Sequence, residues 1–184
     1  MVRIALSLVG LAMAASVAAA PAPSAEASAA VSRTTFSFEA WVEDIITNPD
    51  TALTVDEALA AAEAADVVGS AGGLLSKRAT CDPSGWARAN ARDATSCVND
   101  LARKGGNGVQ CAIGQGQFNI QMCRIGNAKI VGIKNTSPRV AVNCNDIART
   151  AGKIFDSCWR SDGTIVGSQY CITNNKINVG ILGA

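Results

Sequence analysis

Seven cysteines have the widest choice of chemistry in this sequence, because a thiol can form a disulfide, bind a metal or act as a nucleophile. None lies before residue 81, and most neighbours in the set are 12 to 16 residues apart. In an oxidising compartment such spacing is typical of disulfides rather than zinc ligands. Seven is an odd number, so we expect one thiol to be free or to pair with another chain. The set is Cys81, Cys97, Cys111, Cys123, Cys144, Cys158 and Cys171.

Acid–base catalysis has few candidates in residues 79–184, which contain no histidine and no glutamate. This composition excludes a Ser-His-Asp or Cys-His arrangement, a histidine base and a pair of glutamates for glycoside hydrolysis. Six aspartates remain. Two of them, Asp100 and Asp146, are expected in the first turns of helices, where a carboxylate stabilises the helix dipole. The sequence therefore predicts no enzyme, no metal site and no cofactor.

The N-terminal half has the pattern of a processed precursor. In residues 1–19, Arg3 precedes an apolar run that ends in small residues, as in a cleaved secretory signal. Lys77-Arg78 is a dibasic pair of the kind that kexin-like proteases cut. Residues 20–76 carry nine acids and one base, whereas residues 79–184 carry twelve bases and six acids. We therefore predict a secreted, extracellular protein with a signal peptide (1–19), an acidic pro-segment (20–78) and a mature domain (79–184).

Two helices are predicted in the acidic pro-segment. Apolar residues recur at helical spacing from Phe38 to Ile46, with Ser37 as N-cap. Thr54 and Glu57 have the spacing of a capping box and begin a second, alanine-rich helix. Such a segment is expected either to shield the basic domain or help it fold until cleavage, or to act only as a spacer.

An internal duplication organises the mature domain. Residues 99–103 (Asn-Asp-Leu-Ala-Arg) recur as residues 145–149 (Asn-Asp-Ile-Ala-Arg), and Val-Gly-Ile at 131–133 recurs at 179–181. Each half is predicted to form a helix followed by a hairpin, since Asn and Gly at the presumed turns tolerate positive φ. The predicted strands are 118–125, 128–133, 164–172 and 176–182, with turns at 126–127 and 174–175 and weaker strands at 109–113 and 139–142.

The predicted fold is therefore α+β. It has a single antiparallel sheet of four to five strands, with two helices packed on one face and disulfides as reinforcement. Its two αββ repeats are related by pseudo-twofold symmetry. Disulfides of about 2–4 kcal/mol each would supply much of the stability of so thin a core.

The duplication favours equivalent disulfides in the two halves, Cys97–Cys123 and Cys144–Cys171. The alternative is Cys81–Cys171, which would anchor the start of the domain. Spacing alone does not decide between them. The symmetric pairing leaves the free thiol among Cys81, Cys111 and Cys158.

Three basic residues near the link between the halves, Lys129, Lys134 and Arg139, are candidates for facing a target. Ordinary solvated charge is the alternative reading. Asn135-Thr136-Ser137 in the same link is a glycosylation sequon, which is weakened by the proline that follows it. A glycosylated Asn135 and an unmodified loop remain equal alternatives.

Residues 95–182 resemble the small fungal secreted proteins of the killer-toxin-like α/β sandwich group, which includes smut-virus killer toxins and necrosis-inducing effectors. The resemblance rests on a cysteine that opens the first helix (Cys97), a cysteine in the following hairpin (Cys123), the helix at 145–155 and the closing strand at 162–171. The resemblance depends on spacing and pattern more than on exact motifs.

The resemblance implies a secreted effector that binds a target on another cell without catalysis, in fungal antagonism or plant virulence. Its partners would be a kexin-like protease and a protein, channel or membrane surface of a host or competitor cell; nucleic acid is not expected. The alternative is an apoplastic or cell-wall module that binds chitin or glucan and protects its producer. A small enzyme based on aspartate chemistry is a third hypothesis.

Overall fold

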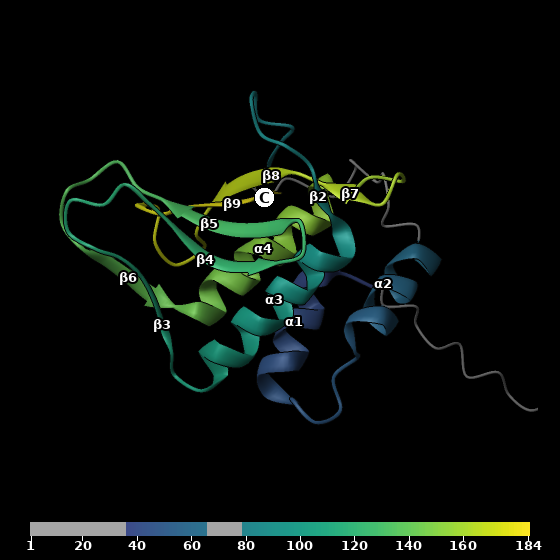
Figure 1. Ribbon diagram of the computed structural model, residues 1–184. Coiled ribbons are helices and arrows are strands. Elements are labelled where there is room, and N and C mark those ends of the chain that lie inside the picture. Colours follow the sequence, from purple (N-terminus) through teal and green to yellow (C-terminus); the bar gives the residue numbers. More distant parts are fainter. Residues whose placement is uncertain (1–35, 66–78) are drawn as a thin grey trace, which may run out of the picture. The chain divides into compact units, whose positions relative to one another are not determined.

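The computed structural model describes residues 36–65 and 79–184, which form an α+β structure of four helices and nine strands (Figure 1). The predicted signal peptide and Lys77-Arg78 lie outside these residues. No helix in the described part of the chain is both long and apolar enough to cross a bilayer. In chain order the elements are α1 (Phe38–Thr47), α2 (Val55–Ala64), β1 (Thr80–Cys81), β2 (Ala89–Asn90), α3 (Ala91–Gly106), β3 (Gln110–Ile113), β4 (Asn119–Ile125), β5 (Ala128–Ile133), β6 (Val140–Asn143), α4 (Cys144–Cys158), β7 (Thr164–Ile165), β8 (Gly167–Tyr170) and β9 (Asn178–Gly183).

Helices α1 and α2 form as their capping residues predict. Ser37 Oγ accepts a hydrogen bond from the backbone N–H of Ala40 at 3.1 Å. Thr54 and Glu57 complete a reciprocal capping box at the start of α2. The apolar stripe of α1 is buried, so this helix packs against the rest of the unit rather than standing free in solvent.

Five strands form one antiparallel sheet in the order β1-β8-β9-β5-β4 (Figure 1). The predicted hairpin of β4 and β5 turns at Gly126, whose φ of 52° favours glycine. Strands β5 and β9 pair at the centre, with Ile130 opposite Ile181. Helix α3 contacts β4 and β5, and α4 contacts β8 and β9. The two weaker predicted strands exist as β3 and β6, which pair with each other outside the main sheet.

The second predicted hairpin is wrong in detail. Residues 164–172 do not form one strand, because β7 pairs with β2 while β8 pairs with β1 and β9. A loop from 171 to 177 replaces the tight turn at 174–175. The backbone N–H of Ile172 donates to Thr150 Oγ1 of α4 at 3.2 Å, which holds the loop against the helix.

Helix α3 begins earlier than the duplicated motif suggests. Asn90 caps it by accepting from the backbone N–H of Asp93, so Cys97 lies inside the helix and does not open it. Asp100 therefore lies in the middle of α3, where it bonds Lys104 at 2.6 Å, and its predicted first-turn position is wrong. Asp146 does lie in the first turn of α4.

Three disulfides reinforce the unit, as is typical of secreted proteins. The predicted Cys97–Cys123 bridge is confirmed and joins α3 to β4. Both predicted pairings of Cys171 are wrong, since it is the free, buried cysteine.

Strand pairing explains the other two bridges. Strand β3 places Cys111 opposite Val142 of β6, two residues before Cys144, and these two cysteines are bonded. Strand β1 places Cys81 opposite Gly167, where a side chain would meet Cys158. Cys81 accordingly bonds Cys158. The prediction of a free thiol among residues 81, 111 and 158 is therefore wrong.

Candidate target-binding face

One side of α4 receives the acidic helix α1. It consists of Arg149, Gly152, Lys153, Phe155 and Asp156 together with Trp159, which follows α4, and we call these six residues the docking face. Residues 149, 152, 153 and 156 recur at i, i+3, i+4 and i+7, so α4 brings them onto one surface. The face combines an apolar centre, two bases, one carboxylate and one residue without a side chain.

Aromatic rings form the apolar centre. The ring of Phe38 in α1 lies 4.5 Å from that of Phe155 and 5.6 Å from that of Trp159, between ring centroids. Phe38 and Phe155 are fully buried and Trp159 is 5% exposed. Such ring pairs add to the free energy of burying their apolar area. Docking of α1 therefore removes a large apolar surface of α4 from water.

Asp156 caps the N-terminus of α1 from another helix. Its two carboxylate oxygens accept from the backbone N–H of Phe38 at 2.7 Å and of Glu39 at 3.1 Å. These donors have no partner within their own helix, and the dipole of α1 favours a negative charge there. Burial nevertheless dominates and raises the pKa of Asp156 to about 6.

Gly152 marks the closest approach of the two helices. A Cβ at this position would lie 3.0 Å from the backbone atoms of Phe38 and Glu39. Any side chain at residue 152 would therefore press against the first turn of α1. Glycine is needed here for contact between backbones rather than for an unusual φ.

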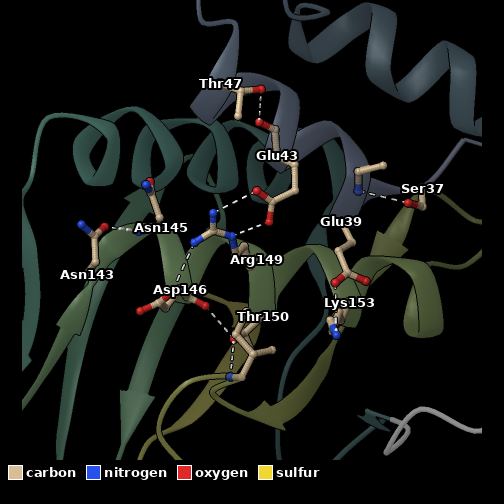
Figure 2. A network of polar contacts seen from close by, with 12 residues as sticks. Ser37, Glu39, Glu43, Thr47, Asn143, Asn145, Asp146, Arg149, Thr150 and Lys153 are labelled. Carbon is tan, nitrogen blue, oxygen red and sulfur yellow. Dashed lines mark hydrogen bonds and ion pairs between the residues drawn. The ribbon is translucent and has the colours of Figure 1, made fainter.

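Figure 2 shows two ion pairs between α1 and α4, one at Arg149 and one at Lys153. Arg149 bonds both carboxylate oxygens of Glu43, with Nη2 at 2.9 Å from Oε2, and also reaches Asp146 at 3.3 Å. Lys153 pairs with Glu39 at 3.1 Å. The hydrogen bonds from Arg149 lower the pKa of Glu43. Bidentate Arg–carboxylate contacts fix orientation as well as supplying energy.

The N-terminal segment also contacts α3. Arg92, near the start of α3, pairs with Asp56 of α2 at 2.7 Å. Arg103 of α3 donates to the carbonyl oxygen of Pro49 at 3.3 Å. Both partners of the Arg92 pair are well exposed, so that pair adds little to stability. Acidic residues of 36–65 thus meet bases of 79–184 at three points.

The predicted basic residues do not form one surface. Lys129 is half-buried near the start of β5, and Arg139 is exposed in the loop after that strand. Lys134 is 4% exposed, and its ammonium group donates to the carbonyl oxygens of Ser137 and Pro138. Lys134 therefore holds its own loop together and cannot face a target. Asn135 is exposed in the same loop.

Sequence reasoning missed the charged residues of the docking face. The signal was present as two matched i,i+4 pairs, Glu39 with Glu43 on α1 and Arg149 with Lys153 on α4. Neither pair reveals its partner alone, because more than a hundred residues separate them. The sequence around Asp156 did not indicate its role, because its hydrogen-bond partners are backbone N–H groups.

A second feature is an open depression of about 970 Å³ beside the loop at 171–177. Tyr170, 58% exposed, and the amide side chains of Asn174, Asn175 and Asn178 line it. The buried Oδ1 atom of Asn178 has no hydrogen-bond partner. Within residues 36–65 and 79–184, no group of three or more histidine, cysteine or acidic side chains could hold a metal ion.

Comparison with known proteins gives one match. Residues 76–183 match the sequence model of a family described as a domain of unknown function (DUF8794). The match begins next to Lys77-Arg78 and leaves α1 and α2 outside it. No curated protein and no solved structure is significantly similar to the chain.

Proposed function

The chain belongs to the DUF8794 family, and from this premise we propose that it is the precursor of a secreted, killer-toxin-like effector. The effector, residues 79–184, acts without catalysis by binding a target on another cell, in fungal antagonism or plant virulence. Its pro-segment holds it inactive until a kexin-like protease cuts after Arg78.

The single observation that carries the proposal is the covering of the docking face by α1. The apolar side of this acidic helix is buried, the ring of Phe38 contacts α4, and its two glutamates pair with bases of α4, which supports a shield rather than a spacer. The family match, which begins at residue 76, supports a functional unit that excludes this helix. Three disulfides fit an extracellular working place.

The proposal also includes the internal symmetry of the fold. We infer that the two αββ halves arose by duplication and are related by a pseudo-twofold axis between β5 and β9. The register supports this inference: Val131 lies opposite Gly180 and Gly132 lies opposite Val179. In the repeat, Val131 is equivalent to Val179 and Gly132 to Gly180, so exchanging the two halves turns each of these pairs into the other.

A cell assay of matched proteins tests the proposed function. Chain cut after Arg78 by a kexin-like protease, and a K77A/R78A chain treated alike, are added to competing fungi and infiltrated into plant tissue. We expect growth inhibition or necrosis from the processed protein and none from the uncut variant. Equal effects of both, or none from the processed protein on any cell tested, would refute the proposal.

A cell-wall module is the second candidate, and the depression beside Tyr170 favours it. An exposed aromatic ring can stack on the face of a sugar, and neighbouring amides can bond its hydroxyl groups. Processed protein should then be retained on chitin or glucan, and Tyr170→Ala should abolish retention. Passage of both proteins through the column unretarded would remove this candidate.

A further inference from the structure

We propose that the docking face is a receptor for a helix of the target protein, and that α1 occupies it as a stand-in for that helix. The partner is an acidic amphipathic helix with an aromatic residue in its first turn. This inference rests on the proposed function, because the face becomes free only when α1 leaves.

The carboxylate of Asp156 specifies a helix by its end. It accepts from two successive backbone N–H groups of α1, as the free N–H groups at the N-terminus of a helix allow. An extended peptide would bring one donor at a time to the same carboxylate. The face therefore selects helical N-termini over strands.

Gly152 sets how close that helix must come. Its missing side chain lets the first turn of α1 approach to backbone contact. At this distance the aromatic side chain of the first turn reaches Phe155 and Trp159. The partner is thus fixed in position along α4 as well as in direction.

Burial shows why the face does not stay empty. Phe155 and Trp159 are almost completely covered in the described structure, and α1 supplies part of that cover. Soluble proteins seldom leave a contiguous apolar patch exposed unless it binds something. A helix with apolar residues at i, i+3, i+4 and i+7, as in α1, fits this patch.

Charge fixes the sign of the partner. Arg149 and Lys153 each meet a glutamate of α1, one turn apart on its flank. A basic helix would bring like charges to both positions and would be rejected. The partly buried carboxylate of Asp156 likewise disfavours an anionic membrane surface as the occupant.

A charge swap measured in trans tests the inference. The chain is cut after Arg78, the N-terminal segment is separated by gel filtration, and a fluorescent peptide of residues 36–48 is titrated by anisotropy. Arg149→Glu should weaken binding by about tenfold or more, since it replaces a bidentate ion pair with repulsion. A peptide carrying Glu43→Arg should restore binding to the Arg149→Glu protein. Arg139→Glu, a matched exposed base outside the face, should change affinity by less than about twofold.

Several results would overturn the inference. The first is an equal loss of peptide affinity in the Arg149→Glu and Arg139→Glu proteins. The second is a failure of the Glu43→Arg peptide to restore binding. The third is an N-terminal segment that stays bound after cleavage as a permanent second chain. Rescue by the swapped peptide shows that an Arg149→Glu protein has kept its fold.

The cell assay separates this inference from the proposed function. Excess peptide 36–48 should block the processed protein, and Arg149→Glu should reduce its effect. Cell activity that is indifferent to both changes would overturn the helix receptor while the effector remains. If the charge swap succeeds but the processed protein has no effect on any cell tested, the results support the helix receptor and refute the effector.

Discussion

Asp156 shows how one side chain can link two segments that lie far apart in the sequence. Its carboxylate bonds the first two N–H groups of α1, yet burial raises its pKa to about 6 from the ordinary 3.8. Glu39 and Lys153 face it with opposite effects on the same pKa. The ionised form is thus disfavoured in the docked state despite its two hydrogen bonds.

This residue makes stability depend on pH in a defined direction. Because its pKa is higher in the folded chain than in the unfolded chain, the folded chain binds the extra proton and loses stability as pH rises from about 4 to 6. The loss amounts to at most about 3 kcal/mol. Asp156→Asn keeps an acceptor but cannot ionise, so its free energy of unfolding in urea should lack this fall between pH 4 and pH 7. Parallel curves for the two proteins would contradict the assignment.

Gly152 offers a second prediction at the residue scale. Gly152→Ala improves helix propensity but forces a Cβ against the first turn of α1. We expect the free energy of unfolding to fall by about 1–3 kcal/mol, as for an overpacked site. Gly106→Ala in α3, where a Cβ meets no atom within 4 Å, should instead stabilise by about 0.5–1 kcal/mol. Equal stabilisation by both changes, measured in urea, would show that α1 and α4 can move apart without loss of stability.

Among the elements, α1 contributes four buried apolar residues to the core, namely Phe38, Trp41, Val42 and Ile45. Phe38→Ala should lower the free energy of unfolding by about 3–5 kcal/mol, because it removes a fully buried ring between Phe155 and Trp159. Phe118→Ala, the same change at a ring that is 54% exposed, should cost less than about 0.5 kcal/mol. Thermal unfolding of the two variants beside the unchanged chain gives the comparison. A small effect at Phe38 would mean that α1 is not docked.

The strands determine which cysteine stays reduced. Alkylation of the unreduced protein in denaturant, followed by peptide mapping, should label one thiol, Cys171. Labelling under native conditions should be slow because this thiol is buried. Cys171→Ser should keep all three bridges, whereas Cys144→Ser should release Cys111. Label on Cys81, Cys111 or Cys158 in the unchanged protein would contradict this pairing.

Local elements could be predicted from the sequence, and contacts between distant elements could not. Ser37 and the Thr54–Glu57 box act on neighbouring residues, so their spacing revealed α1 and α2. The bridge between Cys111 and Cys144 depends on the pairing of β3 with β6, which the symmetry of the two halves did not predict. The docking of α1 on α4 likewise needs Gly152 and Asp156 to meet a helix end far away in sequence. The excess of opposite charge and the two i,i+4 pairs of like charge were the signals of that contact in the sequence.

For the whole molecule, loss of the N-terminal segment should uncover the apolar centre of the docking face. Chain cut after Arg78 and freed of residues 36–65 should therefore bind the dye ANS more strongly than intact chain. A K77A/R78A chain given the same protease is the control and should not change. Unchanged ANS fluorescence in the separated domain would show that Phe155 and Trp159 find another cover within it.

The distance in sequence between α1 and Asp156 also orders events during synthesis. Their hydrogen bond spans 118 residues, whereas the Cys97–Cys123 bridge spans 26. Contacts between distant residues carry a larger loop-closure entropy and form slowly. Helix α1 therefore leaves the ribosome first but finds its binding surface only after α4 has been made. Until α4 has been made, the ring of Phe38 therefore lacks the ring of Phe155 that covers it in the folded chain.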